Sequence, residues 1–461
     1  MLIDNSNIKN SSEYNARQIE STTLTAEQQL ALNFFRPSIP FEKSIVRFID
    51  LFAGLGGTRL GFEQACLEKE LNSKCVFTSE IKEYAISVYQ SNFADSEING
   101  DITKIAPESI PDFDFLLAGF PCQPFSSAGK RNGFLDERGG LFFTILDILS
   151  IKKPKGFLLE NVDGLASHNN GETLKIIIDK LQDLDYHVAW NILDASEFGV
   201  PQKRKRIYIV GHKEHSPNLS EFTKSYITAG AFIEHDAPVK NTPFTKLLSD
   251  KFTPSELYGK SIKDKRGGIN NIHSWDLEVK GEVSEIQKEI LELILKKRRY
   301  KKWAEAKGID WMDGMPLTIE EIRTFYNHPD LETNLKDLTK KGYLTFEHPK
   351  KKVKEDGISK RVSHTLVAKG YNIVVGKLSF PLAKIIDPSD VSPTIVATEA
   401  GKIGVATNKG VRSITVQEGL HFSGFPSSYK ITETDYAKAF DLIGNTVMPP
   451  VIKAVALRLL K

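Results

Sequence analysis

The chain has 461 residues, of which 40% are hydrophobic and 26% are charged, and its formal net charge is +2. A chain of this length is too long for one ordinary hydrophobic core, so we expect two domains. The near-neutral net charge excludes a protein that is basic throughout, but it is compatible with a local surface that binds nucleic acid. The sequence has no apolar run long enough to span a membrane and no secretory signal, so we expect neither a membrane span nor secretion. It has only three cysteines, which predicts no disulfide framework and no zinc site and fits a reducing cytoplasm.

Residues 1–44 are polar and predict a loosely ordered extension. From Val46 to His212, short apolar runs alternate with helical patterns, which is typical of βαβ units and a parallel sheet. The expected strands are 46–51, 75–79, 113–118 and 156–159, closed by a pair at 186–193 and 206–210. The expected helices are 59–71, 83–93, 139–151 and 172–184. We therefore predict an α/β domain over residues 45–212.

The regular alternation stops after His212. Residues 213–395 mix polar loops with isolated apolar runs, and we treat them as a second, smaller domain of mixed structure. Within it, helical patterns followed by a short strand over about 284–346 suggest a small winged-helix-like insert. The basic run 296–302 fits either a solvated helix face or a phosphate-binding surface. Ordered blocks resume over 396–461 and end in a predicted helix at about 450–460.

The most informative segment is Pro121-Cys122-Gln123-Pro124, which follows the apolar run 113–118. Proline restricts the backbone, so this turn would hold a thiol in a stiff loop at the carboxyl end of a strand. In open α/β folds ligands bind at that edge. The segment fits a reactive nucleophile and equally a buried structural cysteine.

Two further groups of side chains are expected at the same edge. Glu160 ends the run 156–159, where partial burial would raise the pKa of its carboxyl group, although an ordinary Glu-Asn turn fits as well. Gln202, Arg204 and Arg206 alternate along a strand and share one face, where the arginines would favour a thiolate. An edge strand with solubilising charges is the alternative for that segment.

A glycine-rich turn, Phe52-Ala53-Gly54-Leu55-Gly56-Gly57, follows the first strand. Gly54 and Gly56 would let the backbone approach a ligand closely, and Glu80, at the end of the second strand, can bind ribose hydroxyl groups. Alone, this turn fits a dinucleotide site or simple packing.

These segments resemble, in the same order, the sequence blocks of the DNA (cytosine-5) methyltransferases. The blocks are Asp50–Gly57, Pro121–Ser126, Glu160–Val162, Gln202–Gly211, Arg412–Pro426 and Gly444–Val447. The resemblance implies a Rossmann-like S-adenosylmethionine-dependent methyltransferase domain with a smaller target-recognition domain at 213–395. It also implies that Cys122 adds to C6 of cytosine, that Glu160 acts at N3, and that Arg204 and Arg206 stabilise the activated base.

By the same resemblance, S-adenosylmethionine is the cofactor. Its expected contacts are Phe52, Gly54, Gly56, Glu80, Asp101, Pro121 and Asn445. Among these, Phe52 would stack on the adenine and Asp101 would bind its amino group. The chain departs from the family pattern at Ile81, where an aromatic residue often follows the ribose-binding acid.

Double-stranded DNA is the expected partner, with the target base flipped out of the helix. The expected DNA contacts are Ser126, Lys130, Arg131, Arg138, Gln202 and Thr394, the first four in a loop that would close over the DNA. The resemblance further implies a monomer in the bacterial cytoplasm, related to a cognate restriction endonuclease by function and not by contact.

Three other functions fit parts of the sequence. A tRNA cytosine-5 methyltransferase shares the fold and the Pro-Cys-Gln-Pro loop, but its Cys-Phe-Thr signature is absent here. A catalytically inactive DNA-binding regulator is disfavoured by the intact set of Cys122, Glu160 and the two arginines. An NAD-dependent enzyme is disfavoured because the glycine-rich turn lacks the G-x-G-x-x-G spacing.

Overall fold

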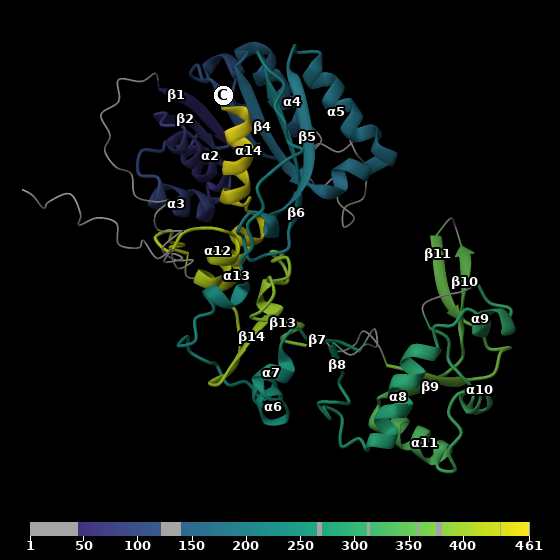
Figure 1. Ribbon diagram of the computed structural model, residues 1–461. Helices are drawn as coiled ribbons and strands as arrows, with labels where there is room; N and C mark the ends of the chain where they lie inside the picture. Colours follow the sequence, from purple (N-terminus) through teal and green to yellow (C-terminus); the bar gives the residue numbers. More distant parts are fainter. Residues whose placement is uncertain are drawn as a thin grey trace, which may run out of the picture.

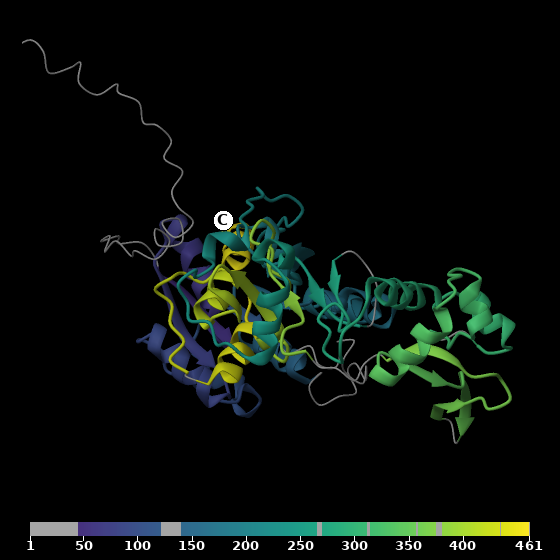
Figure 2. The same cartoon turned by 90° about the horizontal axis from the view of Figure 1, so that it is seen from below.

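The computed structural model describes residues 45–120, 140–264, 270–310, 314–355, 358–374, 380–433 and 435–460. These residues form a large lobe, a middle lobe beneath it, and a satellite lobe set to one side (Figure 1). Figure 2 shows the same separation from below, with the satellite lobe away from the other two. The predicted extension at 1–44 lies outside the described residues.

The large lobe is built on one six-stranded sheet in the order β2-β1-β3-β4-β6-β5. Its strands are β1 (Val46–Leu51), β2 (Ser73–Ser79), β3 (Phe115–Gly119), β4 (Gly156–Val162), β5 (His187–Asp194) and β6 (Lys205–His212). Neighbouring strands from β2 to β4 are parallel, and β6 runs antiparallel to both β4 and β5. The predicted α/β sheet and its closing pair are confirmed.

Helices cover both faces of this sheet. They are α2 (Gly57–Glu68), α3 (Glu83–Asn92), α4 (Gly140–Lys152), α5 (Glu172–Gln182) and the last helix, α14 (Pro449–Leu459). Because both faces are covered, the central strands read as continuous apolar runs and not as alternating patterns. Helix α14 packs directly on α2, where a Cβ on Gly61 would lie 2.4 Å from the Pro449 carbonyl oxygen. The last helix thus packs against the first helix that the structure describes.

The middle lobe contains a five-stranded sheet in the order β15-β14-β13-β7-β8. Its strands are β7 (Ser261–Ile262), β8 (Asn271–Ile272), β13 (Lys384–Ile385), β14 (Ile403–Thr407) and β15 (Gly410–Ser413). Its helices are α6 (Pro243–Lys251), α7 (Pro254–Leu257), α12 (Val416–Phe422) and α13 (Tyr436–Asn445). Segments before and after the satellite lobe therefore meet in one sheet.

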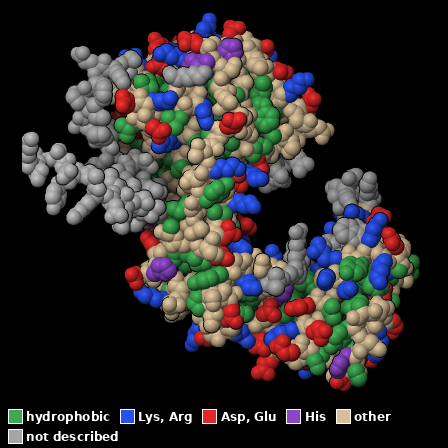
Figure 3. All heavy atoms as spheres, in the orientation of Figure 1, with side chains coloured by type: hydrophobic (Ala, Val, Ile, Leu, Met, Phe, Trp, Pro, Cys, Tyr) green, Lys and Arg blue, Asp and Glu red, His purple; other side chains and the backbone are tan. Residues whose placement is uncertain are grey.

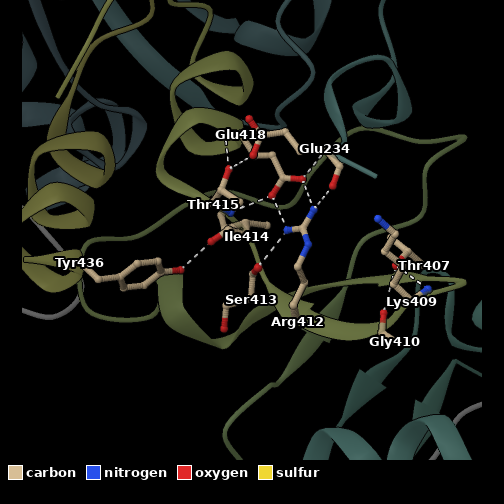
Figure 4. Close-up of polar contacts among 10 residues, drawn as sticks. All are labelled: Glu234, Thr407, Lys409, Gly410, Arg412, Ser413, Ile414, Thr415, Glu418 and Tyr436. Atoms are coloured by element: carbon tan, nitrogen blue, oxygen red, sulfur yellow. Dashed lines mark hydrogen bonds and ion pairs between the residues drawn. The ribbon is translucent and has the colours of Figure 1, made fainter. Parts of the chain in front are cut away.

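A buried ion pair fixes the turn from β15 into α12. Both terminal nitrogens of Arg412 bond the Glu418 carboxylate, at 2.7 and 2.8 Å, and one also donates to the Glu234 carbonyl oxygen (Figure 4). The Thr415 side chain caps α12 and also donates to Glu234. The two charges are 5% and 0% exposed, so removing one alone would leave the other buried without its partner.

The satellite lobe has its own hydrophobic core, which extends from Trp275 to Ile373. It is therefore larger than the predicted 284–346 insert. Its helices are α8 (Glu285–Lys297), α9 (Lys302–Ala306), α10 (Ile319–Arg323) and α11 (Leu331–Lys341). Its strands are β9 (Leu344–Glu347), β10 (Lys350–Glu355), β11 (Ile358–Ser363) and β12 (Gly370–Ile373). Strand β9 pairs with β12, and β10 pairs only with β11.

Among the described residues, one stretch, 436–459, is long and apolar enough by composition to cross a membrane. It consists of the two helices α13 and α14, and 67% of its apolar window is buried within the protein. Its composition is explained by packing in the core.

Candidate active site

A cavity of about 380 Å³ lies at the carboxyl ends of β1, β2, β3 and β4. Its walls come from the turn after β1, the ends of β2 and β4, and the connection between α13 and α14. Among the residues predicted from the sequence, it is lined by Phe52, Gly54, Glu80, Asp101, Glu160, Arg204, Arg206 and Asn445. The structure therefore brings eight of the eleven expected site residues that it describes to one place.

The turn after β1 adopts a left-handed backbone at Phe52 and Gly54, with φ values of 57° and 52°. This conformation aims the Gly54 N–H at the end of β2, where it donates to Glu80 Oε2 at 2.8 Å. Gly56 does not line the cavity. A Cβ at Gly56 would lie 2.4 Å from the Phe93 ring, so this glycine is required for packing behind the turn and not for approach to a ligand.

Glu80 is held rigidly at the rim of the cavity. Besides the Gly54 N–H, its carboxylate accepts the N–H groups of Ile81 and Lys82 at 2.8 and 2.9 Å. These three backbone donors fix the positions of both carboxylate oxygens. The fold therefore sets the direction in which the other lone pairs of Glu80 can accept hydrogen bonds. Ile81, the departure from the family pattern, also lines the cavity and is 68% exposed.

Asp101 and Asn445 reach the same cavity from distant parts of the chain. Asp101 caps the short 3-10 helix Ile102–Lys104 by accepting from the Thr103 hydroxyl and N–H, and these bonds lower the pKa of its carboxyl group. The Asn445 amide donates to Asp441 one helical turn earlier, at 2.8 and 3.0 Å. Both side chains are therefore oriented before any ligand binds.

Glu160 and Arg206 form an ion pair in the wall of the cavity. Arg206 Nε lies 3.1 Å from Glu160 Oε1, and the Glu160 side chain is 9% exposed. Burial raises the pKa of Glu160, and Arg206 and then Arg204 oppose part of that rise by stabilising the carboxylate. The net rise means that Glu160 holds a proton more readily than an exposed glutamate does.

Arg204 is buried and joins three parts of the chain. Its guanidinium donates to the carbonyl oxygens of Ile395, Gly444 and Thr446 at 2.9 to 3.1 Å. It therefore ties the start of β6 to the C-terminal blocks. Its charge still acts on Glu160 through space and stabilises the carboxylate of that residue.

Gln202 and Thr394, both predicted to contact DNA, lie at the junction between the large and middle lobes. Gln202 is fully buried, and its amide donates to the Phe422 carbonyl oxygen and accepts the Ile395 N–H. A direct base contact would break both bonds, so the structure favours a role in holding the junction. Thr394 is exposed, and its hydroxyl donates to the Lys203 carbonyl oxygen at 2.5 Å.

Six predicted residues lie outside the described residues: Pro121, Cys122, Ser126, Lys130, Arg131 and Arg138. The chain that leads to them is well anchored. The Asn161 amide donates to the Phe120 carbonyl oxygen at 3.2 Å, and Gly119 pairs directly with Glu160 across the β3–β4 ladder.

Three polar residues at the site are not predicted from the sequence. Asp441 lines the cavity and accepts from Lys82 and Tyr84, both at 2.6 Å. The spacing of Asp441 and Asn445, one helical turn, is the signal that could have found it. Asn161 belongs to the block Glu160–Val162, from which the resemblance predicts a role for Glu160 alone.

Asp50, the third, is the penultimate residue of β1 and lies beneath the glycine-rich turn. Its carboxyl group accepts from the hydroxyls of Thr58 and Tyr89, at 2.6 and 3.2 Å. Complete burial raises its pKa to about 7, against the opposing effect of those two bonds. An acidic residue inside an apolar strand is the signal for this buried cluster.

Comparisons with known proteins point in one direction. A sequence model of the family described as C-5 cytosine-specific DNA methylase matches residues 46–461. The type II methyltransferase M.NlaIV of Neisseria lactamica is 53% identical over 422 residues, which cover 90% of this chain and 99% of that protein. M.BanI of Aneurinibacillus aneurinilyticus is 40% identical over 437 residues, covering 89% and 94%.

The fold is also similar to a solved structure. A prophage-encoded E. coli protein, predicted to be a DNA modification methyltransferase, matches with a TM-score of 0.50 at 18% identity. The match covers 90% of this chain and 98% of that protein.

Proposed function

The chain belongs to the C-5 cytosine-specific DNA methylase family, so it is a methyltransferase acting on DNA cytosine, and we propose how its own residues carry out that reaction. The substrate is duplex DNA, and the methyl group comes from S-adenosylmethionine. The type II relatives suggest a role in protecting host DNA within a restriction–modification system. We propose a monomer acting in the bacterial cytoplasm, linked to an endonuclease by function alone.

The residues around the cavity fit S-adenosylmethionine. Its volume of about 380 Å³ lies in the range of small-molecule sites, roughly 300 to 1,000 Å³. Glu80 presents a fixed carboxylate for the ribose hydroxyls, Asp101 an acceptor for the adenine amino group, and Phe52 a ring for stacking. The Gly54 backbone and Asn445 complete the wall, and the family resemblance adds Pro121 as a further contact. When bound, this cofactor supplies an electrophilic methyl carbon.

Cys122 supplies the covalent step. Its thiolate forms a bond to C6 of the flipped cytosine, and the electron pair of the C5–C6 double bond moves into the ring toward N3. C5 thereby becomes nucleophilic, which is the purpose of covalent catalysis here. C5 would then take the methyl carbon, and the sulfonium donor would leave as a neutral thioether. Loss of the C5 proton to water and departure of the Cys122 thiolate restore the aromatic ring.

Glu160 acts on N3 during that addition. As negative charge moves to N3, a carboxyl group with a raised pKa can donate its proton there and take it back when the sulfur leaves. Arg206, 3.1 Å from Glu160, orients the carboxyl group and adds positive charge beside the activated base. Arg204 holds the same wall from behind through its three carbonyl contacts.

The observation that carries this mechanism is the register of the central sheet. Gly119 pairs with Glu160, so the segment that continues to Cys122 leaves the sheet beside that carboxylate. A nucleophile at C6 and an acid at N3 act on opposite sides of one small ring, so both must reach the same pocket, and the pairing of Gly119 with Glu160 supports that arrangement.

We further propose that residues 45–212 form the catalytic domain, that 396–461 complete it, and that 213–395 recognise the target sequence. The catalytic blocks lie outside 213–395, and specificity usually resides in segments mounted on a rigid scaffold. Ser126, Lys130, Arg131 and Arg138, next to Cys122, and Thr394, at the junction, remain candidates for DNA contacts.

Bisulfite sequencing of DNA from cells that express the chain tests the function. We expect complete protection of one cytosine within one recurring sequence. Unmodified cytosine throughout, in cells with soluble folded protein, would contradict the proposed activity.

A further inference from the structure

The satellite lobe has the element order of a winged helix–turn–helix unit. Helix α8 is followed by the short helix α9, by a bridge between Leu317 and Tyr371, and then by helices α10 and α11. Strands β9 and β12 pair antiparallel, with Leu344 opposite Ile373, and β10–β11 is the excursion between them. We call the paired strands β10 and β11 the ribbon; they occupy the place of the wing.

The ribbon is strongly basic. Six of the fourteen residues at 350–363 are Lys or Arg and two are acidic, so this short segment carries more net positive charge than the whole chain. It projects from the top of the satellite lobe, on the side toward the large lobe (Figure 1). Lys and Arg side chains gather over this part of the lobe, across an open hollow from the large lobe (Figure 3).

The cations of the ribbon differ from those of the neighbouring helix. In α11, Lys336 pairs with Glu332 at 2.8 Å and Lys341 with Asp337 at 2.6 Å, each one turn apart. Within the part of the chain that the structure describes, no carboxylate lies within ion-pairing distance of the ribbon residues Lys350, Lys352 and Arg361. Helix α11 pairs two of its three lysines with its own carboxylates, whereas the charges of Lys350, Lys352 and Arg361 are left for another partner to neutralise.

The charges lie on both faces of the ribbon. Lys352 is opposite Arg361 on one face, and Lys351 is opposite Val362 on the other. Among the described residues no third strand pairs with either edge. One face carries Lys350, Lys352 and Arg361, and the other combines Lys351 and Lys360 with the three apolar residues of the hairpin, Val353, Ile358 and Val362. An isolated two-stranded hairpin has little stability of its own. Contact with a partner would therefore stabilise this one.

We infer that the ribbon binds the phosphate backbone of duplex DNA, as a sequence-independent grip separate from the elements that select the target; this inference rests on the proposed function. The major groove of B-DNA admits a two-stranded ribbon, and phosphates line both of its walls. Cations on both faces match that arrangement. The narrow major groove of duplex RNA does not admit such an element, so the geometry favours DNA.

The test compares two quadruple variants of the full chain. One removes four exposed ribbon charges: Lys350→Gln, Lys352→Gln, Lys360→Gln and Arg361→Gln. The control removes four exposed charges from the sheet edge opposite the cavity: Lys69→Gln, Lys74→Gln, Lys153→Gln and Lys155→Gln. Binding to target and non-target 30-base-pair duplexes is measured by fluorescence anisotropy over a range of salt concentrations, without any need for methyl transfer.

We expect the ribbon variant to bind both duplexes more weakly by the same factor, at least tenfold at low salt. Its slope of log K against log salt should flatten by about 0.9 for each phosphate that the ribbon no longer neutralises, up to roughly three units. A charge-preserving variant, Lys350→Arg with Lys352→Arg and Lys360→Arg, should keep the wild-type slope, which separates charge from folding.

Three results would overturn the inference. The first is a ribbon variant with the same DNA affinity and salt dependence as the control variant, which would mean that the ribbon charges contact only solvent. The second is weaker binding of the target duplex alone, or methylation of a different site, either of which would make the ribbon a sequence reader. The third is a wild type that binds duplex RNA or polyglutamate as tightly as DNA. If no methylation is detected but the ribbon variant still shows the flattened salt slope, the result counts against the proposed function and not against DNA binding by the ribbon.

Discussion

Gly119 and Glu160 are direct partners in the parallel ladder between β3 and β4. Glu160 also contacts Arg206, which enters from the antiparallel strand β6. Three strands therefore bring the segment leading to the proposed nucleophile, the proposed acid and its cationic partner to one edge of one sheet. Each of these groups has a role that a substitution can test separately.

Replacing Glu160 with glutamine should slow methyl transfer by about 10² to 10⁴-fold, because an amide keeps the shape of the side chain and cannot donate a proton to N3. Single-turnover rates at saturating DNA and S-adenosylmethionine measure this directly. Glu172→Gln, an exposed change at the start of α5, is the matched control and should leave the rate unchanged. A Glu160→Gln enzyme with the wild-type rate would remove Glu160 from the mechanism.

Asp50 should make the stability of the large lobe depend on pH. Its pKa is about 7 in the folded protein, above the value of 3.8 expected when unfolded, so folding favours the protonated form. The stability this group contributes is complete below about pH 4 and is lost as pH rises to about 7, a change on the order of 4 kcal/mol.

Asp50→Asn should abolish that dependence, so the variant gains stability relative to wild type as pH rises from 5 to 8. Thermal midpoints recorded across this range measure it. Asp183→Asn, at an exposed carboxylate after α5, should track the wild type. Parallel curves for Asp50→Asn and wild type would show that Asp50 is ionised in the folded state.

Glu80→Ala should weaken S-adenosylmethionine binding at least tenfold and leave DNA affinity nearly unchanged, because the carboxylate faces the cavity and three backbone N–H groups hold it there. Isothermal titration calorimetry gives the cofactor affinity. Glu83→Ala, three residues later and exposed, serves as the control. Equal reductions in cofactor and DNA affinity would point to local unfolding of the rim.

The two glycines of the turn should respond differently to alanine. At Gly56 a Cβ would lie 2.4 Å from the Phe93 ring, so Gly56→Ala should destabilise the protein by about 1–3 kcal/mol. At Gly54 the nearest atom is 4.0 Å away, so the cost there is the left-handed backbone alone, about 1 kcal/mol. Cofactor affinity should fall in Gly54→Ala. Equal destabilisation by both substitutions would contradict this division of roles.

Apolar patterns predict the sheet well because its strands are buried on both faces. The pattern for β4 stops at Leu159, but the strand continues through Glu160 and Asn161 to Val162, since these residues pair with β6. Polar residues that join a strand through a long-range partner leave no local trace in the sequence. The functional end of the strand is therefore its least predictable part.

Charge patterns along the chain are less informative. The run 296–302 suggests a solvated or phosphate-binding face, but Arg298 is 2% exposed and donates to Asn372, 74 residues away in β12. Gln202 likewise turns inward, because its backbone joins Ser392 before β6 begins. Both outcomes depend on contacts between distant segments, which alternation within one strand or helix cannot reveal.

The central claim is that Cys122 forms a covalent bond to the target cytosine, and trapping on 5-fluorocytosine tests it most directly. Fluorine at C5 cannot leave as the proton does, so the Cys122–C6 bond should persist. With S-adenosylmethionine and a duplex carrying 5-fluorocytosine at the position identified by bisulfite sequencing, we predict a complex stable on a denaturing gel for the wild type and for Cys75→Ser. Cys122→Ser should form none, and a covalent complex of normal yield in that variant would contradict the account.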